Sequence, residues 1–499
     1  MPILSRLKFE IFNSFPAHIS IIFLGIFLRV QQYFFNRSLW LDEAALASSI
    51  IEKNYSALLK PLIGGQLAPF GYLWASKFFA NLIGSHEYGL RFFSLICGVG
   101  SLIAFSFICK VVLDRRAIVF ALLLFALHGQ SIYFASEAKP YSCDVFFTLG
   151  IIFLTIRLMQ LQHTFLYGTL LVMCGALGIW FSFPLILVLV ASLGTLGYFA
   201  LVDSKKVLPW LIIGGVAWAI SYLTLNYFLQ QNFDQGLKDL YSHYWREYFV
   251  SLIPHNAWQL QGLIDHLMGA FKDPGGFYFR SLALLLFFVG GNVLWGKNKF
   301  HAALLFLPIA LTLLASFLKK YPFAERLILF LTPIVIIFVS CGLIAIIDQS
   351  IKLPILKIAL IAMILFHPIL SSAYHVLKPR TREEVDVVLK YINNNWQEGD
   401  VLYIQHFGVD QFNFYKNKMG VEFKNTIVGA HNQSSAEVTA DLDQLKGKGR
   451  VWFLFPHMRY QGEDGAVDRA FFEHLEVLGK RYKNWSFQGL DICFLKVEQ

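Results

Sequence analysis

Long apolar runs constrain this chain more than any other feature of its sequence. About eleven runs are long enough to cross a bilayer as helices. They lie at residues 15–35, 89–112, 116–134, 140–158, 164–181, 184–202, 208–229, 278–296, 300–317, 326–348 and 354–374. Only 15% of the 499 residues are charged, against about 25% in soluble domains, which excludes a soluble enzyme of this size. The sequence predicts an α-helical polytopic membrane protein.

The composition changes where the apolar runs stop. Residues 376–499 hold 16 Lys or Arg and 17 Asp or Glu, whereas residues 1–375 hold 26 and 16. The tail also alternates helical and strand-like patterns. The expected elements are helices at 382–394 and 470–478 and strands at 401–406, 451–456 and 492–497. We predict a transmembrane domain at 1–375 and a small C-terminal extracytoplasmic α/β domain at 376–499.

Basic residues in the short connections set the expected orientation. If the N-terminus, with Arg6 and Lys8, is cytoplasmic, the basic residues of alternate connections all fall on that side. These are Arg115 and Arg116, Arg157, Lys205 and Lys206, Lys297 and Lys299, and Lys352. The odd number of spans then places the tail outside. We expect a multi-pass protein of the plasma (inner) membrane. The tail has no basic excess, so nucleic acid is not an expected partner.

Two sizeable loops fall on the external side. Within the loop 36–88, residues 46–59 have helical apolar spacing and residues 69–83 form an aromatic stretch too short for a span. Both patterns are typical of helices that lie in the membrane interface. The loop 230–277 is rich in Tyr, Trp and His, including Tyr244, which suits an interfacial belt and also contact with a sugar or a lipid.

Two adjacent carboxylates, Asp42 and Glu43, follow the first span on the external side. Such a pair is costly near a membrane unless it is solvated or paired with cations. One interpretation is structural: Asp42 caps the next helix, Glu43 complements its dipole and Trp40 anchors it at the interface. The other is catalytic, with Asp42 as a general base that accepts a proton from an acceptor hydroxyl. The residue pattern leaves both open.

A short external loop crowds Glu137, Lys139 and Tyr141 into one turn before the next span. The structural interpretation is an interfacial ion pair with a snorkelling lysine. The functional interpretation is a phosphate site, in which Lys139 supplies a charge and Tyr141 a hydroxyl at a helix N-terminus.

A second external loop carries Lys319, Lys320, Tyr321 and Arg326, although a positive charge there works against the topology pattern. Such an exception indicates another task for the cations. An anionic lipid phosphate is the expected ligand, and Arg326 can bind it through two hydrogen bonds. Nonspecific contact with lipid headgroups is the alternative.

His86, Glu87 and Arg91 lie at the end of the first loop. Adjacent residues are poorly placed to share one metal ion on a helix, so the sequence predicts no metal site here. His86 and Arg91 are kept as substrate-contact candidates, together with Glu137, Tyr321 and Tyr244.

Taken together, these segments resemble the polytopic glycosyltransferases of the GT-C type, in particular the bacterial relatives of protein O-mannosyltransferases and of the lipid A aminoarabinose transferase. The matching segments are LWLDEA (39–44), APFGYLW (68–74), GSHEYGLRFFS (84–94), SEAKPY (136–141) and YPFAERLILFLTP (321–333). The resemblance covers about residues 15–375 and is weaker in the tail.

The resemblance implies transfer of a sugar from a polyprenyl-phosphate-sugar donor to a hydroxyl of a lipid, glycan or protein acceptor on the external face, with inversion expected from an in-line attack. It implies Asp42 as the catalytic base, with Glu43 beside it. Many relatives have His-Pro-Pro or Glu-Lys-Pro where this chain has Leu67-Ala68-Pro69. That difference leaves Lys139, Lys320 and Arg326 as phosphate candidates. It also argues against a divalent metal ion, and no other cofactor is expected.

Other classes stay open beside this one. A transporter or flippase of lipid-linked sugars would show internal repeats and broken helices at mid-membrane, and neither pattern is clear here. An oligosaccharide ligase would use a diphosphate donor and need more cations around a larger cleft. A non-catalytic scaffold would have no need of the charged external loops.

Overall fold

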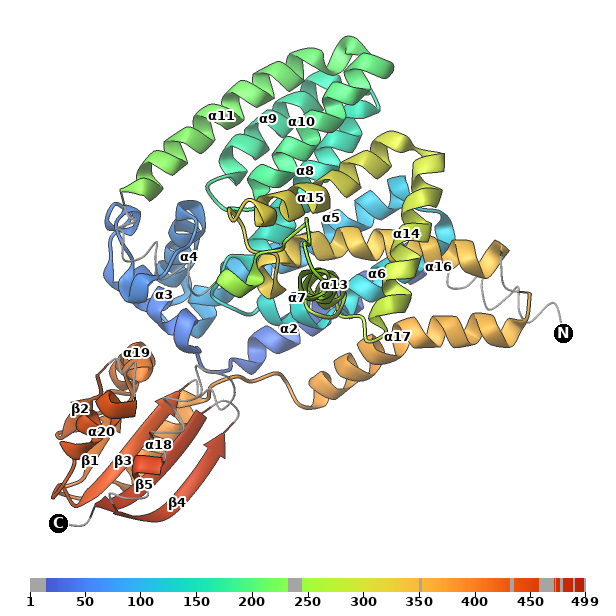
Figure 1. The fold of residues 1–499 in the computed structure, drawn as a ribbon. Helices are drawn as coiled ribbons and strands as arrows, with labels where there is room; N and C mark the ends of the chain where they lie inside the picture. Colours follow the sequence, from blue (N-terminus) through green and yellow to red (C-terminus); the bar gives the residue numbers. More distant parts are fainter. Residues whose placement is uncertain are drawn as a thin grey trace.

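The membrane part of the chain is a bundle of helices, with the C-terminal domain attached at one end (Figure 1). The structure, a computed structural model, describes residues 15–231, 245–349, 352–430, 435–456, 471, 473–475, 479–487 and 490–497. The helices of the membrane part are α2 (Phe15–Phe35), α3 (Leu41–Glu52), α4 (Phe70–Ile83), α5 (Glu87–Val112), α6 (Arg115–Ala126), α7 (Gly129–Phe134), α8 (Tyr141–Met159), α9 (Thr164–Gly178), α10 (Leu185–Val202), α11 (Leu208–Gln230), α13 (Ala257–Lys272), α14 (Arg280–Lys297), α15 (Lys299–Phe317), α16 (Thr332–Gln349) and α17 (Pro354–Leu377).

Eight helices within these described ranges are long and apolar enough to cross a membrane. They are 17–35, 87–112, 141–159, 185–202, 205–230, 299–317, 325–348 and 354–377. The other predicted spans coincide with α6 and α7 together, with the short apolar helix α9, and with α14. The prediction of an α-helical polytopic membrane protein is therefore confirmed.

The predicted span 116–134 is not one continuous helix, because the chain breaks between α6 and α7 at His128. The His128 imidazole accepts a hydrogen bond from the Ser131 N–H at 3.2 Å, which caps the start of α7. Its other ring nitrogen lies 2.6 Å from the carbonyl oxygen of Pro274. The break results from a local side-chain cap, which the apolar pattern of residues 116–134 does not predict.

Ion pairs join connections that were predicted to share the cytoplasmic side. Lys297 pairs with Asp114, and Arg116 lies 2.7 Å from Asp348. In Figure 1 the end of α16 and the start of α17 lie at one end of the helical part, and the C-terminal domain lies at the other. These three connections therefore share one end of the bundle, as predicted. Which end faces the cytoplasm stays a prediction.

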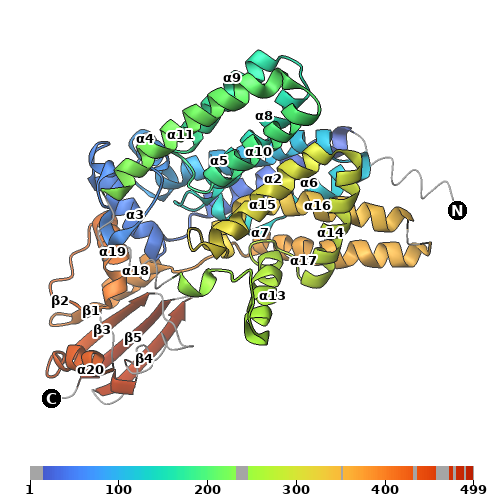
Figure 2. The ribbon, with the colours of Figure 1, turned by 45° about the horizontal axis from the view of Figure 1, so that its top comes forward.

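The two patterns in the loop 36–88 form helices. The first gives α3 and the short 3₁₀ helix η1 (Ala57–Leu59), and the second gives α4. The loop 230–277 contains the unanticipated helix α13, which projects from the bundle (Figure 2). The prediction for this loop rested on its aromatic composition and not on the helical spacing of its apolar residues.

The C-terminal domain is a small α/β unit, as predicted. Its elements are α18 (Val385–Asn395), β1 (Val401–Ile404), α19 (Val409–Met419), β2 (Thr426–Val428), α20 (Ser435–Asp443), β3 (Arg450–Pro456), β4 (Gly479–Phe487) and β5 (Leu490–Val497). The strand order is β2-β1-β3-β5-β4; β2, β1 and β3 are parallel, whereas β5 is antiparallel to β3 and to β4. Of the predicted helix 470–478, residues 471 and 473–475 are helical, and the others lie outside the described residues.

Close packing of α14 against α16 gives a test of the bundle. A Cβ atom on Gly290 would lie 1.9 Å from the carbonyl oxygen of Phe338, whereas one on Gly291 would lie 3.9 Å from the nearest Phe338 side-chain carbon. Gly290→Ala must therefore push the two helices apart and destabilise the protein by about 1–3 kcal/mol. Thermal unfolding in detergent should show a clear loss for Gly290→Ala and little change for Gly291→Ala. Equal melting temperatures would contradict this packing.

Candidate active site

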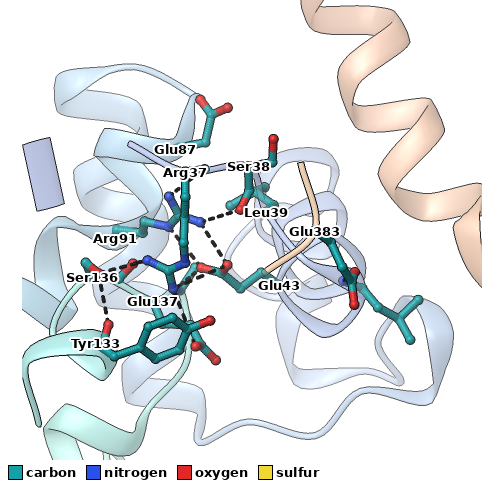
Figure 3. A network of polar contacts seen from close by, with 12 residues as sticks. Arg37, Ser38, Leu39, Glu43, Glu87, Arg91, Tyr133, Ser136, Glu137 and Glu383 are labelled. Atoms are coloured by element: carbon teal, nitrogen blue, oxygen red, sulfur yellow. Dashed lines mark hydrogen bonds and ion pairs between the residues drawn. The ribbon is translucent and has the colours of Figure 1, made fainter. Parts of the chain in front are cut away.

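A buried carboxylate in the first turn of α3 is held by two arginines (Figure 3). Glu43 is fully buried, and its carboxylate accepts hydrogen bonds from Arg91 Nε at 2.9 Å and Nη2 at 2.8 Å. Arg37 Nη2 lies 3.9 Å away, and the Ala138 N–H donates at 2.7 Å. Burial by itself would raise the pKa of Glu43, but the arginines outweigh burial and hold that pKa below its ordinary value.

The same two arginines connect three segments that are far apart in the sequence. Arg91, on α5, donates to the carbonyl oxygens of Arg37 at 2.7 Å and Ser38 at 3.1 Å. Arg37 donates to the carbonyl and hydroxyl oxygens of Ser136, both at 2.8 Å, and its guanidinium lies 4.1 Å from the centre of the Tyr133 ring. These contacts fix the segment before α3 and the turn before α8 in one frame.

Glu137 is the second carboxylate of this frame. Its side chain is fully buried, and its nearest cationic partner is Arg37 at 3.5 Å. Burial raises the pKa of Glu137, and the neighbouring Glu43 carboxylate raises it further. Glu137 is thus a buried group that carries its negative charge less readily than Glu43.

The C-terminal domain holds the same segment from the opposite side. The Leu39 N–H donates to the Tyr415 hydroxyl at 2.6 Å, and Gln411 donates to the Leu39 carbonyl at 3.1 Å. The Leu41 N–H, at the first position of α3, donates to Glu383 at 3.0 Å. Helix α19 packs against α3 (Figure 2). The backbone directly before Asp42 is therefore fixed by both domains.

Asp42 occupies the second position of α3 and does not cap it. The N-cap is Trp40, and no side chain bonds there, so the interpretation of Asp42 as a helix cap is wrong. Asp42 Oδ2 lies 3.5 Å from Arg326 Nη2, and the two side chains are 23% and 14% exposed. This pair joins the loop 36–88 to the loop that carries Lys319 and Arg326, two loops that were predicted to share one side of the membrane. Unlike Glu43, Asp42 keeps contact with solvent.

Aromatic rings surround the guanidinium of Arg326. Its central carbon lies 5.5 Å from the centre of the Trp40 ring, 6.0 Å from that of Tyr141 and 6.0 Å from that of Trp245. Cation–π contacts of this kind hold a guanidinium in place and leave its hydrogen-bonding plane pointing past the rings.

Lys139 is buried rather than snorkelling to the membrane surface. It is 4% exposed, and its ammonium donates to the side-chain oxygen of Gln66 at 2.6 Å. Burial lowers the pKa of Lys139, whereas the nearby Asp42 carboxylate raises it, and burial dominates. Gln66 was not singled out in the sequence, since a lone glutamine in a loop gives no signal.

A cavity of about 590 Å³ opens beside Arg326. One part of its wall is formed by α7, Asp273 and the residues Glu325 and Arg326, which begin the 3₁₀ helix η5 (Glu325–Leu331). The other part is formed by the end of α17 and by the segment 378–382, which is called the connector below. Arg326 contributes to this wall and also reaches Asp42, so its guanidinium lies between the cavity and the carboxylate.

Other predicted residues lie outside this cluster. Lys319 and Lys320 are exposed beyond the end of α15, and the Tyr321 hydroxyl donates to the Leu327 carbonyl at 2.7 Å. The His86 ring packs edge-on against Tyr88, with ring centres 5.8 Å apart. Arg91 is 1% exposed and is bound to Glu43, so it holds the frame instead of facing a ligand. Tyr244 lies outside the described residues.

The carboxylates of this site are paired with arginines and are not arranged to bind a metal ion. Within the part of the chain that the structure describes, no three His, Cys, Asp or Glu side chains come together as a metal-binding group. The three carboxylates of the cluster, Asp42, Glu43 and Glu137, each face a guanidinium within 4 Å. The residues present therefore do not form a cage for a divalent cation.

Solved structures match this chain over nearly its whole length. The archaeal oligosaccharyltransferase AglB from Archaeoglobus fulgidus, solved with an inhibitory peptide and a dolichol-phosphate, is 12% identical at a TM-score of 0.52, and the match covers 96% of this chain and 74% of that one. ArnT from Cupriavidus metallidurans, solved with undecaprenyl phosphate, is 10% identical at a TM-score of 0.53, and the match covers 96% and 97%. No protein-family model matches, and no curated protein matches the sequence. Identities this low show the fold alone, which is the predicted GT-C-like fold.

The buried frame predicts a large cost for removing Glu43. Glu43→Ala leaves the guanidinium of Arg91 buried without its partner, which should lower the free energy of unfolding by about 3–5 kcal/mol. Asp348→Asn is the matched control, because it removes an ion pair whose side chains are 45% and 36% exposed and should cost ~1 kcal/mol or less. Thermal unfolding of both variants in the same detergent compares them, and similar losses would argue against the frame.

The raised pKa of Glu137 predicts a pH dependence. A group whose pKa is higher in the folded state stabilises the fold below its unfolded pKa, and this contribution is lost as pH rises through the folded pKa. Glu137→Gln removes that loss. The melting temperature of the variant minus that of the parent protein should therefore become more positive between pH 4 and pH 8. A difference independent of pH would contradict the assignment.

Proposed function

We propose that this chain is a membrane glycosyltransferase that takes a sugar from a polyprenyl-phosphate-linked donor and passes it to a hydroxyl of a cell-envelope acceptor. The observation that carries the proposal is the pair of Asp42 and Arg326, a partly exposed base beside a cation, next to a 590 Å³ cavity. The fold supports it, because ArnT was solved with undecaprenyl phosphate and AglB with a dolichol-phosphate.

In the proposed reaction the acceptor oxygen attacks the anomeric carbon of the sugar. The new glycosidic C–O bond forms as the bond from the anomeric carbon to the phosphate oxygen breaks, and the electron pair of that bond stays on the phosphate. The Asp42 carboxylate takes the proton of the acceptor hydroxyl. Arg326 stabilises the charge that grows on the leaving phosphate. Attack opposite the leaving group inverts the anomeric centre.

The ion pair between Asp42 and Arg326 supports a shared role for the arginine. A guanidinium has five N–H donors in a planar fork, so Arg326 can bind a phosphate while it stays near Asp42. Binding a phosphate on the other side of Arg326 weakens its pull on the Asp42 carboxylate, which makes that carboxylate a better base. Lys139, bound to Gln66, supplies a further positive charge in the same region.

The remaining predicted residues take supporting places in this proposal. Glu43, with Arg91, is a positioning residue that fixes the start of α3, since its carboxylate is fully buried. The Tyr141 ring lies against Arg326 and helps to hold it. Lys319 and Lys320 are exposed and are proposed to contact lipid headgroups. The reaction is proposed to take place on the external face, with the N-terminus cytoplasmic and the C-terminal domain outside.

A second candidate is transfer of a whole oligosaccharide. The likeness to AglB, described as an oligosaccharyltransferase, favours it. The cavity of about 590 Å³ has the size of a site for one small ligand, which favours a donor with a short glycan. Transfer of a single sugar is therefore the preferred proposal, and the acceptor can be a lipid, a glycan or a protein.

Asp42→Asn tests the base. The amide cannot accept the proton, so transfer should fall by about 10²–10⁴-fold while the melting temperature stays unchanged. Mass spectrometry of envelope lipids and glycans, in cells lacking the gene and complemented with each variant, reports the missing hexose, pentose or amino-sugar. Lys320→Gln, a change of charge at an exposed position, should restore the product as the parent protein does. Full product with Asp42→Asn would exclude Asp42 as the base.

A further inference from the structure

The cavity beside Arg326 brings together the membrane bundle and the connector to the C-terminal domain. Four arginines or lysines line it, Arg326 and the connector residues Lys378, Arg380 and Arg382, against two carboxylates, Asp273 and Glu325. The formal charge of the lining is therefore +2. In the part of the chain that the structure describes, no carboxylate lies within 4.0 Å of the three connector cations.

The connector cations are held in place by the bundle. The Arg380 backbone donates to the Gln32 side-chain oxygen at 3.0 Å and accepts from the Gln32 side-chain nitrogen at 2.9 Å. The Arg380 guanidinium lies against Gly129, where a Cβ atom would come within 2.5 Å of it. Arg382 lies 3.3 Å from the centre of the Trp40 ring. These contacts preorganise two guanidinium groups toward one wall.

A half-buried cation without a carboxylate partner is costly, and an anion bound beside it removes the cost. Burial lowers the pKa of Arg380, and the more distant Asp273 carboxylate only partly opposes that effect. Arg382 is also partly buried, on the face of Trp40. The lining therefore favours an anionic ligand, and guanidinium groups pair with phosphate through two parallel hydrogen bonds.

We propose that Arg380 and Arg382 of the connector, together with Arg326, bind the phosphate of a polyprenyl-phosphate lipid in this cavity. The inference rests on the proposed function and assigns two residues outside the bundle to its donor site. A phosphodiester carries one negative charge, and the released monoester carries close to two, which matches the lining charge of +2. The volume, about 590 Å³, leaves room for a sugar beside the phosphate.

The lipid chain has an apolar path away from this cavity. Tyr374, in the cavity wall, is 53% exposed, and Leu370 and Leu377 on the same helix are 56% and 88% exposed. Only 22% of the apolar window of α17 is buried in the protein. A polyprenyl tail can therefore lie along α17 in the bilayer while its phosphate reaches the connector.

The connector also links phosphate binding to the catalytic helix. Glu383, the residue directly after Arg382, accepts a hydrogen bond from the Leu41 N–H, and Leu41 precedes Asp42. A phosphate bound to Arg382 therefore lies one residue along the chain from Glu383, whose hydrogen bond to Leu41 holds the start of α3. The C-terminal domain takes part in the donor site through this segment.

A binding experiment with the full-length protein in lipid nanodiscs tests the inference. The probe is farnesyl phosphate, and its Kd is measured by calorimetry for the parent protein and for Arg380→Gln, Arg382→Gln and Lys424→Gln. The two connector variants should each weaken binding about tenfold or more, because a charged hydrogen-bonded contact is lost. Lys424→Gln, at an exposed position of the C-terminal domain outside the cavity, should leave the Kd unchanged. Arg380→Lys should recover part of the loss if charge is what matters.

Further arms identify the ligand. Farnesol should not bind, because it lacks the phosphate, and inorganic phosphate should bind more weakly than farnesyl phosphate, because it lacks the chain. Nanodiscs with and without phosphatidylglycerol should give the same Kd for farnesyl phosphate. Competition by phosphatidylglycerol would assign the cavity to a phospholipid headgroup and overturn the inference. If a connector variant does not fold, judged by thermal unfolding, the same arginine is replaced by lysine instead, and the loss of the two parallel hydrogen bonds should still weaken binding.

The outcomes separate this inference from the proposed function. Asp42→Asn should bind farnesyl phosphate at least as tightly as the parent protein, because it removes a carboxylate that competes for Arg326, even though transfer is lost. If Arg326→Gln weakens binding and the connector variants do not, the inference is overturned and the proposed transferase stands. If the connector variants weaken binding and no sugar transfer is found by mass spectrometry, the phosphate site stands and the proposed function falls.

Discussion

The buried contact between Glu43 and Arg91 is the interaction on which the rest of the site depends. Removing a carboxylate and a guanidinium from water costs several kcal/mol each, and only good geometry with further hydrogen bonds offsets that cost. Here Arg91 binds both oxygens of Glu43 and two backbone carbonyls, and the Ala138 N–H completes the carboxylate. The contact fixes the direction of α3, and Asp42 points elsewhere because Glu43 points inward.

The C-terminal domain completes this arrangement. Its residues Gln411 and Tyr415 bond to the Leu39 backbone, and Lys418 lies 2.6 Å from Glu87 at the start of α5. The domain therefore contacts the same segment that the bundle holds through Arg91. The backbone before Asp42 is bound on two sides. The position of the Asp42 backbone is therefore fixed, and only the side-chain torsions of Asp42 can still move its carboxylate. A site of this kind is preorganised for chemistry.

The helical membrane fold, and the placing of Asp42 and Arg326 at the same end of the bundle, could be predicted from the sequence. Apolar runs report burial in lipid directly, and alternating connections then decide which loops share an end of the bundle. Lys139, Asp42 and Arg326 fell on one end by this rule and lie close together. Gln66 could not be predicted, because its role depends on one hydrogen bond across 73 residues. The break at His128 depends likewise on a local cap rather than on hydropathy.

The cations of the connector were not predicted as site residues. Lys378, Arg380 and Arg382 follow the last apolar run directly, a place where basic residues ordinarily mark a membrane boundary. In the proposed orientation the connector lies on the external side, where that explanation fails, as it does for Arg326, so the same physical exception applies to both segments. The structure places them around one cavity. A cation on the side where topology does not require it is best explained by an anion that it binds, and the four cations of this cavity share that explanation.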